Sequence, residues 1–332
     1  MRWLFKAAVQ GAISQLPDSA RWNYYIQKNV TRSFDDKHSL LSRRFQWCAE
    51  HLELHARFRP EKPVPQRVLE LGAGWIPTVP LALFLSGVEE IYTIDVQRLI
   101  RDDLLGEVLD YLAASSLDEI RRMLPTARVD RYRELQSAIA ACRQPAGARK
   151  AGQNSPPQNR CVETGPLFDR LGIRYVIGDA RSTGLEPASI DYIVSNTTLE
   201  HIGPDVLDGI FREFRRIVHP HGLMSHLIDM GDHYQHFDPS ITPYNFLRYR
   251  SSTWRLLNND VMYQNRLRIT HYQSLHRQTG FHIVHEAITD DYRNALKDIE
   301  LAPEFRQFKP EELAPTAVWA VSKPNGLPKN GH

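Results

Sequence analysis

Residues 67–96 read RVLELGAGWIPTVPLALFLSGVEEIYTIDV and decide the fold. The stretch opens with an apolar run at residues 68–71, breaks at Gly72 and Gly74, and continues as an apolar segment at residues 79–85 before a second apolar run. This order predicts a strand, a glycine turn, a helix and a second strand. The length, about 30 residues, is that of one βαβ unit in an open α/β sheet.

The polar residues of this stretch indicate what the turn could bind. Gly72 and Gly74 allow a sharp turn and let a ligand approach the main-chain amides. Asp95 ends the second strand, where a carboxylate can accept both hydroxyls of a ribose. Glu70 would repel the pyrophosphate of a dinucleotide, and Pro77 stands where the dinucleotide fingerprint has its third glycine. A ligand with an amino acid tail and a sulfonium would suit the acid better.

The set of Glu70, Gly72, Gly74 and Asp95 resembles the first motif of the class I S-adenosylmethionine-dependent methyltransferases. That motif reads acid, any residue, Gly, any residue, Gly, with a ribose-binding acid after the next strand. The family usually has a further glycine where this chain has Ile76. The resemblance implies an α/β fold with a Rossmann-like, seven-stranded, mostly parallel sheet whose last strand is antiparallel. It also implies S-adenosyl-L-methionine as the cofactor.

Further apolar runs extend the resemblance over residues 67–323. They predict strands at residues 173–177, 190–194, 223–230, 281–288 and 316–322, with a turn at residues 219–222. The last two strands match the closing hairpin of the family, which inserts an antiparallel strand into the sheet.

Residues after the third and fourth predicted strands complete the cofactor site that the resemblance implies. Asp179 would meet the adenine amino group, and Asn196 would lie near the sulfonium. His201 ends a Leu-Glu-His segment typical of the family; it could face the transferred methyl group or cap a helix, and both interpretations stay open. The predicted cofactor-binding residues are Glu70, Gly72, Gly74, Asp95, Asp179, Ala180 and Asn196.

Composition narrows the class of protein. The chain has 332 residues, of which 42% are hydrophobic, so it can bury a large core. Its 41 basic and 39 acidic residues give no footprint for nucleic-acid binding. The cysteines, Cys48, Cys142 and Cys161, are expected to be reduced thiols of a cytoplasmic protein. No apolar run is long enough to predict a membrane-spanning helix.

The sequence predicts a helical N-terminal extension, residues 1–60, ahead of a methyltransferase domain at residues 61–323 and a flexible tail at residues 324–332. The first helix is amphipathic. It could dock on its own protein or make peripheral contact with the inner face of the membrane, and both interpretations stay open. Two insertions are expected, at residues 100–165 and 229–265, and the first contains a predicted mobile loop at residues 144–161.

The second insertion is the predicted acceptor region. It mixes aromatic residues with acids, histidines and arginines, a combination that suits a polyhydroxylated or ring-bearing acceptor. An oxygen nucleophile must lose a proton, and His233 is the predicted base, with Asp232 or Asp229 orienting or replacing it. The predicted catalytic residues are therefore His233, Asp232 and His201.

A metal site is not expected, although one alternative stays open. Mixed oxygen and nitrogen donors at short spacing could bind a divalent ion. No ligand spacing here is diagnostic. The residues concerned are Asp229, Asp232, His233, His236 and Asp238.

The turn at residues 70–77 and the Gly-Asp-His-Tyr segment at residues 231–234 resemble bacterial methyltransferases found among surface-polysaccharide and secondary-metabolite genes. This resemblance implies O-methylation of a sugar, a glycan or another small polar acceptor. Two alternatives are a noncatalytic methyltransferase-like scaffold subunit and a nicotinamide-dependent oxidoreductase, and Glu70 and Pro77 disfavour the second. The oligomeric state is left open.

Overall fold

The computed structural model describes residues 2–29, 36–143 and 164–326. The predicted mobile loop and most of the predicted C-terminal tail lie outside the described residues. The chain divides into two compact units. The motif unit consists of residues 36–180 and 190–192, and the C-terminal unit consists of residues 1–35, 181–189 and 193–332.

Three parallel strands form the sheet of the motif unit. They are β1 (Arg67–Leu71), β2 (Glu90–Asp95) and β3 (Ile173–Ile177), with β2 in the middle. In the register of these strands, Glu70 lies opposite Thr93 and Asp95 lies opposite Ile177. The carboxyl ends of the three strands therefore share one edge of the sheet, which is where open α/β sheets bind ligands.

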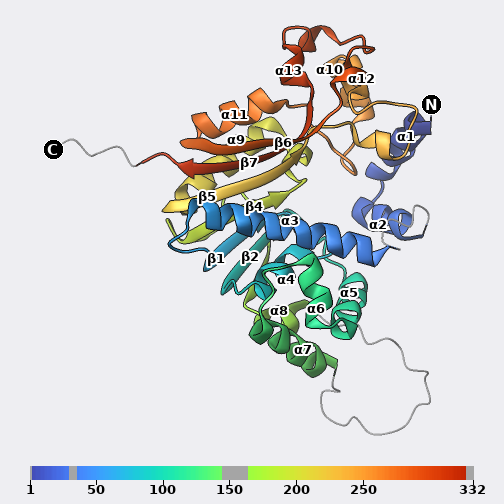
Figure 1. Ribbon diagram of the computed structural model, residues 1–332. Coiled ribbons are helices and arrows are strands. Elements are labelled where there is room, and N and C mark those ends of the chain that lie inside the picture. Colours follow the sequence, from blue (N-terminus) through green and yellow to red (C-terminus); the bar gives the residue numbers. More distant parts are fainter. Residues whose placement is uncertain (1, 30–35, 144–163, 327–332) are drawn as a thin grey trace, which may run out of the picture. The chain divides into compact units, whose positions relative to one another are not determined.

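Six helices accompany these strands in the described part of the motif unit (Figure 1). The sequence predicted the helix at α4 and a helical extension that contains α3, but it did not predict α6, although its Ser116–Glu119 capping box is a recognisable start signal. Helix α4 is apolar all round and buried along its whole length, so it forms part of the core. The helices are α3 (Lys37–Phe58), α4 (Thr78–Leu85), α5 (Asp102–Ala114), α6 (Leu117–Met123), α7 (Val129–Arg143) and α8 (Thr164–Arg170).

The remaining strands run through the C-terminal unit, except that the first three residues of β4 are grouped with the motif unit. Strand β7 pairs antiparallel with both β5 and β6 (Figure 1). Val318 of β7 lies opposite Ile228 on one side and Ile288 on the other. The strands are β4 (Ile190–Asn196), β5 (Val218–Asp229), β6 (Phe281–Asp291) and β7 (Pro315–Pro324).

The seven strands form one sheet in the order β3-β2-β1-β4-β5-β7-β6. The last strand along the chain is inserted between two earlier ones and is antiparallel to both. The predicted α/β class and the Rossmann-like sheet with an antiparallel last strand are thus confirmed.

One local prediction is wrong. The expected turn at residues 219–222 lies inside β5, which begins at Val218. Strand β7 pairs only with Met224–Asp229 of β5, so Pro220 stands outside that ladder. Proline is tolerated at such a position because no ladder hydrogen bond needs its missing N–H.

Helix α1 (Arg2–Ser14) docks on its own unit. Trp3 and Ala7 are buried in a hydrophobic cluster, and the Trp3 ring centroid lies 5.5 Å from that of Tyr234. The backbone N–H of Trp3 donates a hydrogen bond to Asp238 Oδ2 at 3.1 Å. Peripheral membrane contact through the outer face stays a prediction. Among the described helices, none combines the length and the apolar content needed to cross a bilayer.

The described part of the C-terminal unit has six further helices. They are α2 (Ser19–Asn29), α9 (Pro204–Ile217), α10 (Ser251–Leu257), α11 (Ile269–Gln278), α12 (Arg293–Leu296) and α13 (Pro310–Leu313). Short 3₁₀ turns, η1 (Leu199–His201), η2 (His233–His236), η3 (Asn245–Arg248) and η4 (Pro303–Phe305), lie between them.

A buried arginine ties the ends of two strands together. Arg268 is fully buried, and its guanidinium donates hydrogen bonds to the carbonyls of Met230, Leu313 and Pro315 at 2.5–2.6 Å. Burial lowers the pKa of Arg268 to about 10, so the group keeps its charge at neutral pH. The three carbonyls have this one side chain as a common donor.

We expect Arg268→Met to lower the free energy of unfolding by about 3 kcal/mol, because it leaves buried carbonyls without a donor. Urea denaturation followed by circular dichroism measures the change. Arg255→Met, at an exposed position of α10, is the control and should stay within about 0.5 kcal/mol of the wild type. Equal effects of the two substitutions would contradict the structural role of Arg268.

Candidate functional site

The glycine turn after β1 is open on the side where a ligand would approach. Gly72 and Gly74 have φ angles of +86° and +67°, a region that favours glycine. A Cβ at Gly74 would have no heavy atom within 4 Å, so the space beside this residue is free. The N–H of Gly72 donates to Ile94 O at 2.9 Å, which ties the turn to β2.

Glu70 lies at the end of β1 with only 2% of its surface exposed. Thr93 Oγ1 donates a hydrogen bond to its Oε2 at 2.9 Å. Burial raises the pKa of Glu70 to about 8; the hydrogen bond from Thr93 opposes this rise, and the charge of Asp95 adds to it. Most Glu70 carboxyls are therefore neutral at pH 7, and a nearby cation would favour the ionised form.

Asp95 ends β2 with one carboxylate oxygen left for a ligand. Its Oδ2 is buried and has no hydrogen-bond partner among the described residues. Burial raises the pKa of Asp95 to about 6, against the effect of the Tyr175 hydroxyl and of the N–H groups of Ala73 and Gly74. A buried acceptor without a partner fits a ribose hydroxyl, which would supply the missing hydrogen bond.

Asp179 and Ala180 follow β3. Asp179 is exposed and Ala180 is buried. Because β1, β2 and β3 are parallel, both residues lie at the edge that carries Glu70 and Asp95. The motif unit thus brings six of the seven predicted cofactor-binding residues to one edge of its sheet, and their chemistry fits an adenosyl amino acid.

Sequence reasoning missed Arg44 of α3. Its Nη1 donates to Ile76 O at 3.0 Å and so holds the loop that follows the glycines. Burial lowers the pKa of Arg44 to about 10, while the charge of Glu70 acts in the opposite direction. Nothing in the sequence distinguishes Arg44 from the neighbouring Arg43, because only the packing of α3 decides which of the two faces the loop.

The seventh predicted residue, Asn196, ends β4 and is half-buried. Thr197 follows with a φ angle of +45°, which is an outlier for a β-branched residue. Its N–H donates to Leu227 O of β5 at 2.8 Å. This strained residue turns the chain into η1, and such outliers gather at functional sites.

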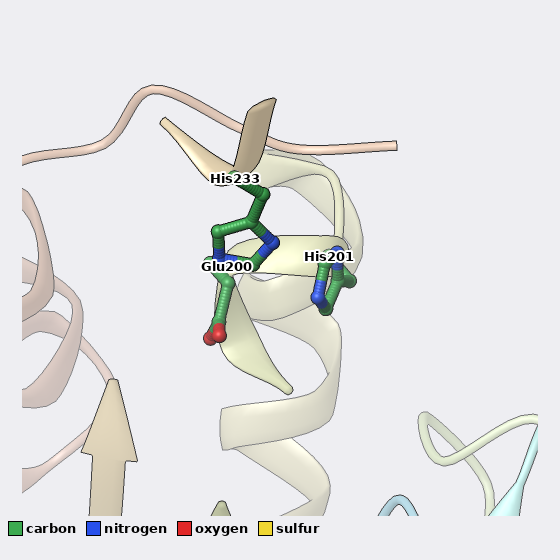
Figure 2. Close-up of side chains that lie close together, drawn as sticks. All are labelled: Glu200, His201 and His233. Atoms are coloured by element: carbon green, nitrogen blue, oxygen red, sulfur yellow. The ribbon is translucent and has the colours of Figure 1, made fainter. Parts of the chain in front are cut away.

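A cluster of three ionisable side chains lies in the C-terminal unit (Figure 2). Glu200 and His201 come from η1 and His233 begins η2, and their donor atoms lie within 4.8 Å of one another. The rings of His201 and His233 meet edge to face, with centroids 4.9 Å apart. Two of the three predicted catalytic residues, His201 and His233, are thus brought together.

The pKa values of the ionisable groups in and around the cluster are shifted from their usual values. Burial, and then the charge of Asp229, raises the pKa of Glu200 well above its usual range. Loss of hydration, and then the charge of His233, lowers the pKa of His201 to about 4, although part of the ring is exposed. Burial would raise the pKa of Asp229, but interaction with His233 outweighs it and the net shift is downward.

The third predicted catalytic residue, Asp232, has a different environment. Asp232 is fully buried. Its carboxylate caps η2 by accepting a hydrogen bond from Tyr234 N at 2.9 Å, and it accepts a second bond from Asn245 Nδ2 at 3.0 Å. Asp229, the other acid considered, has its Oδ2 3.3 Å from His233 Nε2. Of the five residues weighed as metal ligands from the sequence, only His233 belongs to the cluster.

Sequence reasoning also missed the segment that holds the cluster, Tyr263 to Asn265. The carbonyl of Tyr263 lies 2.7 Å from His201 Nδ1, and Gln264 Oε1 accepts from His233 N at 3.2 Å. The N–H of Asn265 donates to Glu200 O at 2.7 Å. Each of three consecutive residues therefore binds one member of the cluster. They stand at the end of the predicted acceptor insertion, but no spacing in the sequence gives them this role.

Comparison with known proteins gives one family match. A family model described as a methyltransferase domain matches residues 137–225, a range that takes in β3, β4 and much of β5. No curated protein matches the chain.

Solved structures similar to this chain include three methyltransferases. An S-adenosylmethionine-dependent methyltransferase of Methanosarcina mazei is 14% identical, with coverage of 78% of this chain and 92% of that one and a TM-score of 0.38. A putative sarcosine dimethylglycine methyltransferase of Galdieria sulphuraria is 15% identical (85% and 86% covered, TM-score 0.41). An S-adenosylmethionine-dependent methyltransferase of Mesorhizobium loti is 16% identical (82% and 97% covered, TM-score 0.39).

The family match and the fold agree on one chemistry. The matched range supplies the third and fourth strands and the turn after them. The strands ahead of it supply an open glycine turn and a buried acid with a free acceptor, which suit an adenosyl amino acid. Residues 137–225 therefore match a methyltransferase domain, and the chain is an enzyme whose methyl donor is S-adenosyl-L-methionine.

Proposed function

We propose that this enzyme methylates a hydroxyl oxygen of a sugar, a glycan or another small polar acceptor. The observation that carries the proposal is the cluster of Glu200, His201 and His233, with Asp229 beside it. A hydroxyl must give up its proton during methyl transfer, so its site needs ionisable groups that bind or polarise the oxygen. The aromatic and polar residues of the insertion at 229–265 would suit such an acceptor.

The cofactor supplies an electrophilic methyl group, and the chain's own residues bind and orient it. Asp95 would accept hydrogen bonds from the ribose hydroxyls, and the space beside Gly74 would admit the amino acid tail. Glu70 would favour the positive charge of that tail. Asp179 and Asn196 would contact the adenine and the region of the sulfonium. Methyl transfer needs the nucleophile in line with the methyl group, so this positioning supplies much of the rate.

The catalytic roles of His233, His201 and Asp232 stay predictions. Between the two acids considered as the partner of His233, the proposal takes Asp229. Its Oδ2 is 3.3 Å from His233 Nε2, whereas the carboxylate of Asp232 accepts bonds that cap η2.

Asp95→Ala should weaken binding of S-adenosylhomocysteine by about 10–100-fold, because the ribose loses hydrogen bonds to a charged acceptor. Isothermal titration calorimetry measures the affinity, with NAD as a comparator that should not bind. Asp169→Ala, at an exposed position of α8, is the matched control and should bind as the wild type does. Unchanged affinity in Asp95→Ala would remove Asp95 from the cofactor site.

Binding of S-adenosylhomocysteine should strengthen as the pH rises from 6 to 8. The pKa of Glu70 is raised to about 8, so ionisation of Glu70 beside the ligand's ammonium group costs free energy at lower pH. The gain should be at most about tenfold per pH unit. Calorimetry at several pH values measures it, and Glu70→Gln should flatten the profile. The same slope in both proteins would show that Glu70 does not sense the ligand.

The acceptor chemistry can be read from the product. With S-adenosylmethionine that carries ¹³C in its methyl group, we expect product signals at the chemical shifts of O-methyl groups when sugars and glycans are offered as acceptors. The Asp95→Ala protein is the negative control. Methylation of amine acceptors alone, seen at N-methyl shifts, would contradict the proposed acceptor and leave the methyltransferase activity intact.

A further inference from the structure

Glu200 is a buried acid without a partner. Only 1% of its surface is exposed, and neither carboxylate oxygen has a hydrogen-bond partner among the described residues. Buried polar groups are normally hydrogen-bonded, and a buried carboxylate is costly unless a cation or several donors compensate for it. The Glu200 carboxylate is therefore a place where a cation or a hydrogen-bond donor would be favourable.

Two histidine side chains near this carboxylate each have a ring nitrogen that could bind a metal ion (Figure 2). His201 Nδ1 lies 2.7 Å from the carbonyl oxygen of Tyr263. A carbonyl can only accept, so Nδ1 carries the hydrogen and Nε2 keeps its lone pair. His233 Nε2 has no hydrogen-bond partner of good geometry, although Asp229 Oδ2 lies 3.3 Å away.

The spacing of these donors is close to that of a metal site. The donor atoms of Glu200, His201 and His233 lie within 4.8 Å of one another. Bonds of about 2.1 Å to a tetrahedral ion place ligand atoms about 3.4 Å apart. The donors would have to approach one another by up to about 1.4 Å, the difference between 4.8 and 3.4 Å, to reach that separation.

The surroundings also resemble those of a ligand set. Metal-binding histidines usually donate their second ring N–H to a carbonyl or a carboxylate, which fixes the ring. His201 donates to Tyr263 O in this way. The backbone N–H of His233 donates to Gln264 Oε1, and the N–H of Asn265 donates to the backbone carbonyl of Glu200. The His201 ring and the backbones of His233 and Glu200 are thus held in place before any ion binds.

We propose that Glu200, His201 and His233 bind a divalent metal ion of the Zn²⁺ or Mn²⁺ kind. Two imidazole nitrogens and one carboxylate oxygen suit these ions better than Mg²⁺ or Ca²⁺, which prefer oxygen donors throughout. Three protein ligands leave at least one coordination position open, as in sites where an ion acts on a substrate. The proposal that these residues bind a metal ion does not depend on which acceptor the enzyme methylates.

A role for the ion in the reaction rests on the proposed function. An ion at this place would polarise an acceptor hydroxyl and make its proton easier to lose. His233 would then act as a ligand, because a nitrogen bound to a metal has no lone pair left for a proton. The metal site and the predicted base thus give His233 two mutually exclusive roles.

The test is metal binding to protein freed of metal with a chelator and then dialysed. Calorimetry with Zn²⁺, and visible absorption with Co²⁺ in its place, should show a single ion bound per chain. Glu200→Gln and His233→Ala should each weaken Zn²⁺ binding by at least about tenfold. His221→Ala, which removes an exposed histidine at the start of β5, is the matched control and should bind Zn²⁺ as the wild type does. Zn²⁺ affinity unchanged in Glu200→Gln, or no binding to the wild type, would overturn the proposal.

Thermal unfolding distinguishes a specific loss of metal binding from misfolding of the variant. Without metal, Glu200→Gln should melt no lower than the wild type, because the amide removes a buried acid that has no partner. With Zn²⁺ in excess, the Tm of the wild type should rise above that of the variant, since a ligand that binds the folded state stabilises it. An equal rise in both proteins would place the ion elsewhere. Calorimetry with S-adenosylhomocysteine, which should bind both proteins alike, separates failure at this site from failure of the methyltransferase assignment.

Discussion

Parallel pairing of β1 with β2, and of β2 with β3, is the constraint on which the cofactor half of this enzyme depends. Parallel strands that run in register must end on the same side, so the residues that follow them converge without any contact among their side chains. Glu70, Asp95 and Asp179 reach one edge in this way although they lie far apart in the chain. The glycine turn adds the free space that an amino acid tail needs, and Arg44 of α3 holds the loop that follows it.

Much of this half could be predicted from the sequence because its signals are local. Apolar runs predicted the strands, Gly72 and Gly74 predicted the turn, in which both adopt positive φ, and Asp95 was placed correctly at a strand end. The prediction that β7 is antiparallel rested on the family resemblance, because pairing between distant segments leaves no local signal in the sequence. The short helix α6 was not predicted despite its capping box, and residues 219–222, where a turn was expected, lie inside β5.

The second half of the site could be predicted only in part, for a physical reason. His201 and His233 could be named from the sequence because histidine side chains can accept protons. Glu200 was treated as part of a family segment and not as a functional group. Its significance comes from burial without a hydrogen-bond partner, which no sequence pattern records. The choice between Asp229 and Asp232 likewise depended on which carboxylate was already occupied in capping η2.

The segment Tyr263 to Asn265 binds its three partners through consecutive residues, so the contacts share one register. Insertion or deletion of a single residue just ahead of Tyr263 would shift all three contacts together. Gradual change of length is therefore unfavourable at this point of the chain. The ionisable cluster and the segment that binds it are therefore expected to be inherited as one block.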